Sequence, residues 1–162
     1  MIRSLSILGI ILFILTIAKG CEKDYPKYIS IDCKLVDQYG NEKSTFNQKD
    51  SIVFEFYLSN YSGEVATYLR PCLQFGNYLN VYRKEADGNY IYYGRPNYYC
   101  PAVAIWDSIY DGVTLLVTKI IWTEKLEWPE RKPGEYYIGD TLSLSVNSDL
   151  MKTYKRIYFE IE

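Results

Sequence analysis

Four stretches of the chain alternate between apolar and polar residues, which is the pattern of a strand with one buried face and one face in water. They are residues 28–37, 51–60, 141–146 and 155–162. A fifth stretch, residues 113–125, is apolar on both faces and predicts a central or sheet-crossing strand. No segment of ten or more residues after the first twenty has convincing helical periodicity, although residues 100–112 could hold one helical turn ending near Asp107 or Ser108.

Turn-forming residues separate these stretches. They stand at residues 39–41, 60–63, 87–89, 132–134 and 139–140. Residues 78–94 read as a hairpin in which Asp87 and Gly88 supply the positive φ angles of a tight turn. About eight strands with regular turns predict one all-β domain over residues 28–162, an antiparallel immunoglobulin-like β-sandwich of about 7–9 strands.

The first twenty residues have the layout of a secretory signal peptide. Arg3 gives a charged start, and residues 5–18 are almost continuously apolar. That run is shorter than the roughly 20 residues that a membrane-spanning helix needs. Ala18 and Gly20 are the small residues that signal peptidase requires just before Cys21. The alternative interpretation is a buried N-terminal helix.

The segment that ends at Cys21 resembles the bacterial lipobox, in which the cysteine after the cleavage site receives a diacylglyceride. Lys19 departs from the usual small residue, as in the relaxed lipoboxes of Bacteroidota. The resemblance implies that residues 1–20 are removed, that Cys21 is lipidated and that residues 21–27 form a tether. It implies a protein anchored by lipid to the outer membrane, on its periplasmic or surface face. Glu22 and Asp24 resemble a weak surface-export signal, and a solvated linker explains them equally well.

Residues 46–64 resemble the second-strand signature of immunoglobulin-like domains related to the intracellular proteinase inhibitor of bacilli. Asp50 opens the strand, and Asn60 with a Ser-Gly turn closes it. In residues 132–138, Gly134 and Tyr136 suit a tyrosine corner, where the hydroxyl bonds back to the preceding backbone. The resemblance implies the fold, and it makes proteinase inhibition an alternative function. The signal peptide predicted for this chain differs from the family's intracellular inhibitor, so the resemblance supports the fold better than it supports inhibition.

Composition argues against several classes of activity. The chain has no histidine, which removes Ser-His-Asp and Cys-His hydrolysis and histidine-ligated zinc. After residue 20 it carries 16 basic and 20 acidic side chains, so we expect no nucleic-acid partner. Glu124, Glu127 and Glu130 make a histidine-free carboxylate glycosidase a further alternative, but nothing shows them facing each other across a cleft. We therefore expect no enzyme and no cofactor.

The cysteines predict one disulfide. If Cys21 is lipidated, three remain, too few and too widely spaced for a metal cluster. Cys33 alternates with apolar residues, which predicts a buried free thiol. Cys72 and Cys100 bracket the predicted hairpin, so we expect them to pair.

Two short motifs suggest other sites. Residues 85–89 superficially resemble a calcium loop, but Pro96 stands where the distal bidentate acid is needed, so a turn explains them and we expect no metal. The Asp-Ser/Thr-aliphatic tripeptide on which exported Bacteroidota proteins are O-glycosylated is matched three times. The candidate acceptors are Ser51, Ser108 and Thr141.

Tyrosine is over-represented, with 18 residues in 162, and it is concentrated between residues 78 and 99. Two interpretations are open. Tyrosine covers the solvent-exposed face of many sheets, but it also offers a binding partner a large rigid contact area with a polar tip. Alternation cannot bury every ring of this segment. We therefore expect a contact patch for a glycan or a surface protein made by Tyr92, Tyr93, Arg95, Tyr98 and Tyr99. The predicted function is an envelope-anchored, non-catalytic binding or assembly module.

Overall fold

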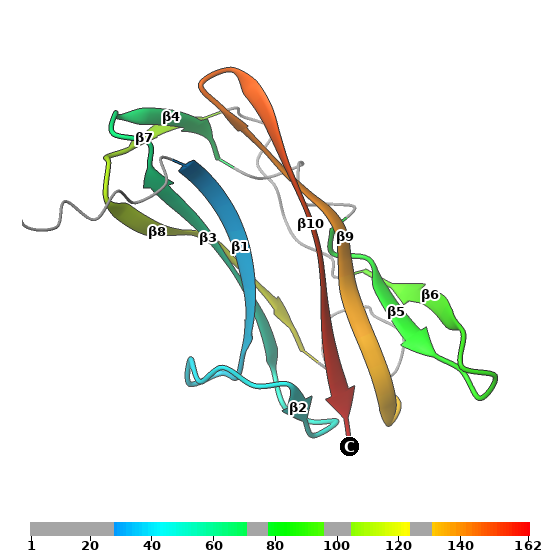
Figure 1. Cartoon of the computed structure of the whole chain (residues 1–162). Helices are drawn as coiled ribbons and strands as arrows, with labels where there is room; N and C mark the ends of the chain where they lie inside the picture. The colour runs from blue at the N-terminus through cyan, green and yellow to red at the C-terminus, as the bar shows by residue number, and fades with distance from the viewer. Residues whose placement is uncertain (1–27, 71–77, 96–104, 124–130) are drawn as a thin grey trace, which may run out of the picture.

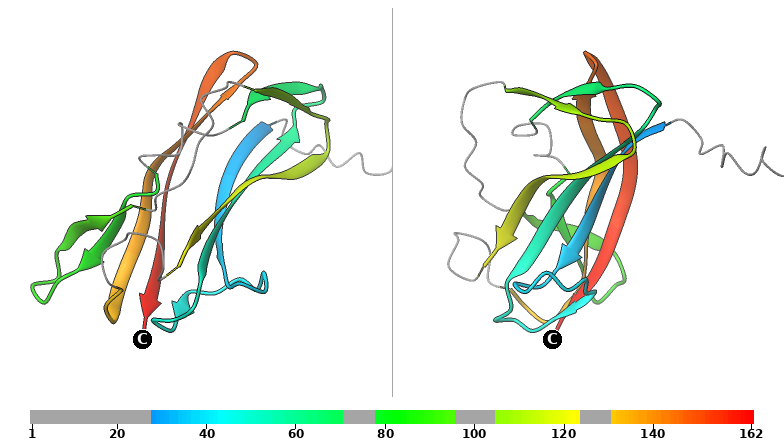
Figure 2. Two further views of the ribbon diagram at one scale, coloured as in Figure 1. Left: turned by 180° about the vertical axis from the view of Figure 1, so that it is seen from behind. Right: turned by 90° about the vertical axis from the view of Figure 1, so that its left-hand side faces the viewer.

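The computed structural model describes residues 28–70, 78–95, 105–123 and 131–162, apart from the side chain of Asp140. These residues form ten strands in two facing layers, with no helix among them (Figures 1 and 2). The all-β sandwich is confirmed. The ten described strands exceed the 7–9 that were expected, and one of them, β2, has only two residues. Within the same ranges, no helix is long and apolar enough to cross a membrane.

The strands divide unequally between the layers. In chain order they are β1 (Tyr28–Val36), β2 (Thr45–Phe46), β3 (Ile52–Tyr61), β4 (Ala66–Leu69), β5 (Val81–Lys84), β6 (Tyr90–Gly94), β7 (Trp106–Ile109), β8 (Val113–Trp122), β9 (Gly134–Val146) and β10 (Asp149–Ile161). The smaller sheet has the order β1-β3-β8, and the larger has the order β2-β10-β9-β4-β7 with the β5–β6 hairpin attached to β9. Among the described strands, pairing is antiparallel except that the two residues of β2 run parallel to the end of β10.

The core lies between the sheets, where the alternation places it. Ile31, Cys33 and Leu35 of β1 are buried, and so are the alternate residues of the other three patterned strands. These are Ile52, Phe54, Phe56 and Leu58 on β3, Leu142, Leu144 and Val146 on β9, and Phe159 and Ile161 on β10. The four alternating stretches therefore predict the core face correctly.

Of the two expectations for residues 113–125, a central or a sheet-crossing strand, the central position is wrong. β8 pairs only with β3 among the described strands and leaves Val113, Leu116 and Ile121 at least 36% exposed. The central strand is β3, with partners on both edges. Its central place explains why β3 also buries Val53 and Glu55 on its outer side.

Three local expectations also need correction. Trp106–Ile109 is a strand rather than a helical turn, because it pairs antiparallel with β4. Gly139 and Asp140 lie inside β9 rather than in a turn. Between β5 and β6, in the turn of the hairpin at residues 85–89, only Gly88 has a positive φ, of 84°, while Asp87 does not. The turn is therefore longer than two residues, and it is closed by the N–H of Glu85 donating to the carbonyl of Asn89 at 2.8 Å.

The predicted tyrosine corner is present. The hydroxyl of buried Tyr136 donates to the carbonyl oxygen of Lys132 at 2.5 Å, which fixes the entry into β9. Burial, together with the neighbouring Tyr93, raises the pKa of Tyr136 to about 12. Asn60 has a similar structural role, since its buried amide donates to the carbonyls of Glu64 and Ile109 and so fixes the turn after β3.

Candidate functional site

Strand register brings four tyrosines into one line across the outer face of the larger sheet. Tyr92 on β6 pairs with Tyr82 on β5, Tyr82 pairs with Tyr137 on β9, and Tyr137 pairs with Tyr158 on β10. We call these four residues the tyrosine row. All four face away from the core, because their neighbours Val81, Ile138, Tyr136 and Phe159 point into it.

The rings of the row are in contact along its whole length. Tyr82 and Tyr137 stack with their centroids 4.7 Å apart and their planes inclined by 13°. Tyr92 meets Tyr82 edge to face at 5.9 Å, and Tyr158 lies tilted against Tyr137 at 5.6 Å. Tyr90 adds edge contacts to Tyr137 and Tyr158 at 4.9 and 6.1 Å. Such packing holds the rings in place before any ligand arrives.

The stack determines what the row can offer a ligand. Tyr137 is only 7% exposed because its neighbours cover both of its faces, whereas Tyr92 and Tyr158 are 56% and 54% exposed. Contact with a ligand therefore falls on the two ends of the row. A hollow of about 270 Å³ lies beside the Tyr158 end and is lined by Ser44, Thr45, Tyr90, Glu135, Tyr136, Tyr158, Phe159 and Glu160.

Polar and charged groups border the row. The ammonium of Lys84 lies 2.9 Å from a carboxylate oxygen of Glu135, and this contact raises the pKa of Lys84. The Tyr90 hydroxyl lies 3.5 Å from the same carboxylate. Partial burial and then the charge of Glu135 raise the pKa of Tyr90. On the other side, the Arg156 guanidinium lies over the Tyr137 ring at 4.9 Å. The surroundings of the row therefore provide several groups that can form hydrogen bonds with a ligand.

The contact patch expected from the sequence is only partly assembled. Tyr92 and Arg95 are exposed, as expected. Tyr93 points to the opposite side of β6 and packs against Tyr136 with ring centroids 5.5 Å apart, so it does not share a surface with Tyr92. Tyr98 and Tyr99 lie outside the described residues, as do Cys21, Cys72, Cys100 and the glutamates at 124, 127 and 130.

Three members of the row were missed at the sequence level. Alternation places Tyr158 opposite Ile157 and Phe159, and Tyr137 opposite Tyr136 and Ile138, so both rings could be assigned to an outer face. Nothing local shows that Tyr82 lies between Tyr92 and Tyr137. That placement depends on the pairing of β5 with β9, two strands about 50 residues apart in sequence.

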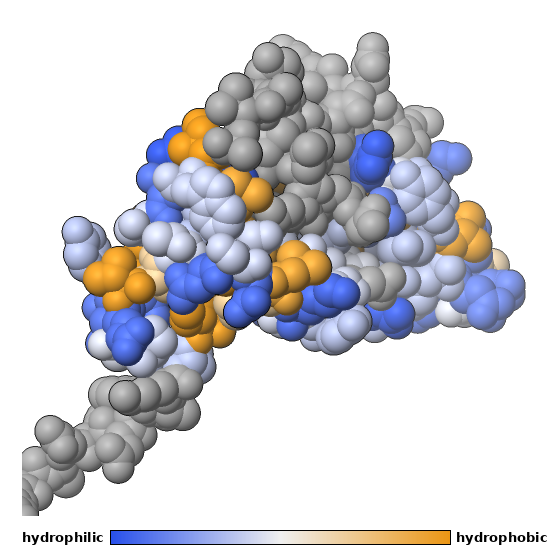
Figure 3. Space-filling model, turned by 90° about the horizontal axis from the view of Figure 1, so that it is seen from above, coloured by the Kyte–Doolittle hydropathy of each residue, from blue (hydrophilic) through white to orange (hydrophobic). Residues whose placement is uncertain are grey.

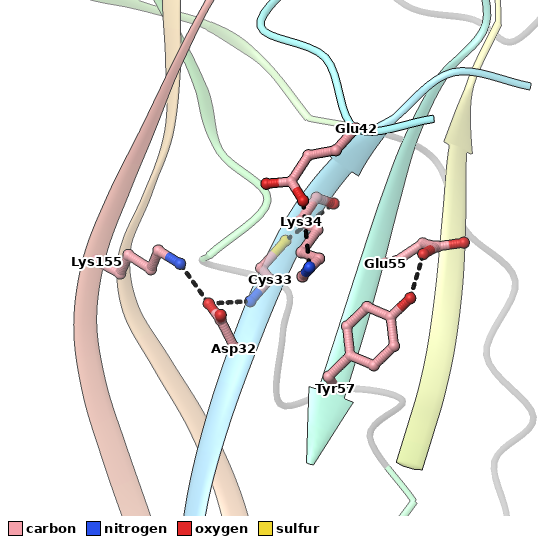
Figure 4. A network of polar contacts seen from close by, with 7 residues as sticks. All are labelled: Asp32, Cys33, Lys34, Glu42, Glu55, Tyr57 and Lys155. Carbon is pink, nitrogen blue, oxygen red and sulfur yellow. Dashed lines mark hydrogen bonds and ion pairs between the residues drawn. The ribbon is translucent and has the colours of Figure 1, made fainter. Parts of the chain in front are cut away.

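A second cluster of polar residues lies around the small sheet (Figure 4). The Lys155 ammonium on β10 bridges to Asp32 on β1 and so ties together the facing edges of the two sheets. On the outer side of the small sheet, the buried Glu55 carboxylate accepts from Lys119 and from the Tyr57 hydroxyl, both at 2.5 Å. These bonds lower the pKa of Glu55. Every carboxylate named here has a cation or a hydroxyl as partner, so the cluster stabilises the fold.

The remaining sequence candidates have ordinary surroundings. Cys33 is buried with a free thiol, and burial raises its pKa. In the turn at 85–89, the carboxylate of Glu85 pairs with Arg83 and that of Asp87 accepts from Asn89. The three candidate acceptors for glycosylation differ in access: Ser108 is exposed, while Ser51 and Thr141 are half-buried.

The end of the sandwich opposite the C-terminal end of β10 offers a different surface (Figure 1). β4, β7 and the tip of the β9–β10 hairpin lie there, close to the start of β1 at Tyr28 (Figure 1). Apolar and polar side chains are interspersed over the described part of this end, without one continuous apolar area (Figure 3). The tyrosine row is therefore the better candidate for a binding surface.

No known protein family matches this chain, and a search of curated proteins also found no match. One solved structure with a similar backbone is the alkylpurine DNA glycosylase AlkC of Pseudomonas fluorescens, bound to DNA that contains an abasic site analogue. The TM-score is 0.38 at 13% identity, and the match covers 83% of this chain and 30% of that one. This chain thus spans less than a third of the glycosylase, and a similarity this low says nothing about activity.

Proposed function

We propose that this chain is an exported lipoprotein of the cell envelope, anchored through Cys21, whose domain binds a glycan without catalysing a reaction. The observation that carries the proposal is the tyrosine row, with its two exposed ends at Tyr92 and Tyr158. Tyrosine provides a rigid apolar contact and a hydroxyl in one side chain, which suits a ligand that is itself both apolar and polar. Sugar rings, with their C–H faces and hydroxyl rims, have that character.

The shape of the surface favours an extended ligand over a small enclosed one. The row crosses four strands on the outer face of a sheet, and the hollow beside it holds only about 270 Å³. Glu135 and Lys84 stand next to the rings and can bond sugar hydroxyls. A glycan chain lying across the row would contact both exposed ends.

The position of the row also fits a protein anchored at its N-terminus. β1 begins at Tyr28 at one end of the sandwich, while the row lies in the other half, near the C-terminal end of β10 (Figure 1). A tether leading to Cys21 would leave from the end remote from the row. The binding surface would then face away from the membrane.

Glycan binding is tested with the purified mature chain on an array of neutral and acidic oligosaccharides, followed by calorimetry on the best ligand. We expect Tyr92→Ala and Tyr158→Ala each to weaken binding roughly tenfold, since an aromatic side chain at a binding surface contributes on the order of 1–2 kcal/mol. Tyr39→Ala is the matched control, because Tyr39 is 80% exposed in the turn after β1. Binding by none of the sugars, or equal loss in the Tyr39 variant, would contradict the proposal.

The lipid anchor needs its own experiment. Cells expressing the full chain should incorporate labelled palmitate into the protein, and Cys21→Ala should abolish the label. A soluble, unlabelled mature protein from the unaltered chain would show that ordinary signal peptidase processes it and that the anchor is absent.

A further inference from the structure

The outer face of β4 and β7 is built from uncharged side chains. Ala66, Tyr68 and Ile109 are buried, so the residues that alternate with them point outward. The outward side chains, with one flanking residue on each strand, are Val65, Thr67, Leu69, Trp106, Ser108 and Tyr110. Trp106 is 49% exposed beside its pairing partner Leu69, and the two flanking residues, Val65 and Tyr110, are exposed as well.

This face continues onto the tip of the β9–β10 hairpin. The pairing of Tyr68 with Val146 places β4 directly beside the end of β9. Ser145 and Leu150 pair across β9 and β10, both point outward, and Leu150 is exposed. Aromatic, aliphatic and hydroxyl side chains therefore cover four strands at this end of the sandwich. We call its five larger apolar members the apolar end: Val65, Leu69, Trp106, Tyr110 and Leu150.

The composition of this face suits a bilayer interface better than a protein partner. Figure 3 looks onto this end of the sandwich and shows aliphatic side chains among paler ones, the shade that its scale gives to tryptophan, tyrosine, serine and threonine. The core of a stable protein–protein interface is more continuously apolar. The headgroup region of a membrane accommodates such a mixture, because tryptophan and tyrosine bury their rings there and keep their polar tips in water.

The chain leaves the domain for its proposed anchor at this same end. β1 begins at Tyr28, which pairs with Tyr61 at the end of β3. The neighbouring Asn60 amide donates to the Ile109 carbonyl of β7 at 3.0 Å. The start of β1 accordingly lies close to β4 and β7 (Figure 1).

The tether is short compared with the domain. Cys21 stands seven residues before Tyr28, a segment that can span at most about 25 Å. The 13 residues of β9 alone extend over about 43 Å. A lipid at Cys21 would therefore keep the apolar end within about 25 Å of the membrane surface, whichever way the domain tilts.

The charges around the apolar end argue against an electrostatic contact. Six charged side chains flank its members along the strands and turns: Glu64, Arg70, Asp107, Asp111, Asp149 and Lys152. Arg70 and Asp107 pair with each other, and the Asp111 carboxylate accepts from the Gly63 amide at 2.8 Å. Because acidic groups outnumber basic ones among the six, anionic headgroups would not attract this end. A membrane contact here must be made by the uncharged side chains.

We infer that the apolar end rests on the lipid headgroups of the membrane that holds the anchor, with Trp106 and Tyr110 at the interface. The inference rests on the lipid anchor of the proposed function, to which it adds a second contact and an orientation. Tyr137 lies about 26 Å from Ser145 along β9, so the tyrosine row stays in solution while this end is in contact.

The test measures whether Trp106 touches lipid. Lipidated protein from cells that express the full chain is placed in phosphatidylcholine vesicles whose acyl chains carry bromine, which quenches tryptophan emission on contact. The chain has two other tryptophans, Trp122 and Trp128, so the difference between wild type and Trp106→Phe isolates the signal of Trp106. We expect brominated lipid to quench a part of the emission that Trp106→Phe lacks, most strongly with bromine near the headgroup. Raising the salt concentration should leave this quenching unchanged.

A matched pair of variants tests the extent of the face. Leu150→Glu places a carboxylate in the apolar end on a different strand, and should reduce the quenching of Trp106 at least about twofold, because charge is costly to bring into a bilayer. Ile121→Glu is the control, since Ile121 is 46% exposed on β8 in the other sheet, and should leave the quenching as in wild type. Thermal unfolding of each variant checks that the fold is retained.

The outcomes separate this inference from the proposed function. A palmitate-labelled protein without quenching of Trp106 overturns the inference and leaves the anchor intact. Loss of quenching at high salt, or equal loss in Leu150→Glu and Ile121→Glu, overturns it as well, because the contact would then not be made by the apolar end. An unlabelled, soluble mature protein overturns both the anchor and the inference.

Two further measurements address other occupants of this face. A mature Cys21→Ser chain that sediments as a dimer, and as a monomer after Trp106→Ala, overturns the inference in favour of a second copy of the chain. Ser108 is also a candidate acceptor for glycosylation and lies on the same face. A glycan found on Ser108 by mass spectrometry overturns the inference too, because the sugar would hold this end away from the bilayer.

Discussion

The carbonyl oxygen of Lys155 occupies the space that a side chain at Gly139 would need. A β-carbon built on Gly139 would lie 2.1 Å from that oxygen, and the glycine has a φ of 116°. Gly139 on β9 pairs with Arg156 on β10, the residue that follows Lys155, so the close approach is between backbones and cannot be relieved by a side-chain rotation.

We therefore expect Gly139→Ala to be strongly destabilising, by roughly 3–5 kcal/mol, because both strain and overpacking apply. Urea unfolding followed by circular dichroism measures the change. Gly88→Ala is the matched control: its φ is also positive, but no atom lies within 4 Å of the added carbon. That substitution should cost only the 1–2 kcal/mol or so of a left-handed backbone. Equal losses in the two variants would mean that the contact with Lys155 has no effect.

Gly139 also shows where sequence reasoning fails for this fold. A glycine before an aspartate is an ordinary turn signal, and the requirement for glycine comes instead from β10. By contrast, the core faces of β1, β3 and β10 followed from local alternation, because a period of two determines which residues point inward. The position of β8 at the end of its sheet could not be deduced in the same way, since an apolar run does not reveal how many neighbours a strand has.

The candidate site was harder to predict than the core for a similar reason. The abundance of tyrosine predicted an aromatic surface, and Tyr92 belongs to it. The expected patch followed the chain through residues 92–99, whereas the tyrosine row crosses strands. Side chains that are adjacent in sequence on a strand point to opposite faces, so a surface must be assembled from register, which the sequence does not specify.

Two buried tyrosines should respond oppositely to loss of the hydroxyl. The Tyr136 hydroxyl donates to the Lys132 carbonyl, whereas the buried Tyr78 hydroxyl has no partner among the described residues. We expect Tyr136→Phe to lower the free energy of unfolding by about 1 kcal/mol, the usual loss of one hydrogen bond. Tyr78→Phe should be neutral or stabilising, because it removes an unsatisfied buried group. No loss for Tyr136→Phe would contradict the tyrosine corner, and a clear loss for Tyr78→Phe would contradict the absence of a partner for its hydroxyl.

The ion pair around Glu55 predicts an acid-dependent loss of stability. Hydrogen bonds from Lys119 and Tyr57 lower the pKa of Glu55 below its usual value near 4.5. The folded state therefore favours the carboxylate, and this contribution is complete above about pH 4.5 and is lost as the pH falls through the lowered pKa. Glu55→Gln should cost about 2 kcal/mol at pH 7 and progressively less below pH 4.5.

Unfolding of wild type and variant between pH 2.5 and 7 gives that difference directly. Glu64→Gln, an exposed substitution in the turn after β3, should follow wild type throughout the range. A constant difference between wild type and Glu55→Gln at every pH would show that packing, and not ionisation, accounts for the loss.

The thiol of Cys33 should be inert until the domain unfolds. It is only 2% exposed, and burial raises its pKa, so neither access nor thiolate is available to an alkylating reagent. We expect iodoacetamide to leave Cys33 unlabelled in the folded protein even at pH 9, and to label it once urea is added. Peptide mapping without reductant should then find Cys33 labelled, and Cys72 and Cys100 joined to each other. A Cys33→Ser variant identifies the labelled peptide. Label on Cys33 in the folded protein would contradict its burial, and label on Cys72 or Cys100 would contradict only the disulfide.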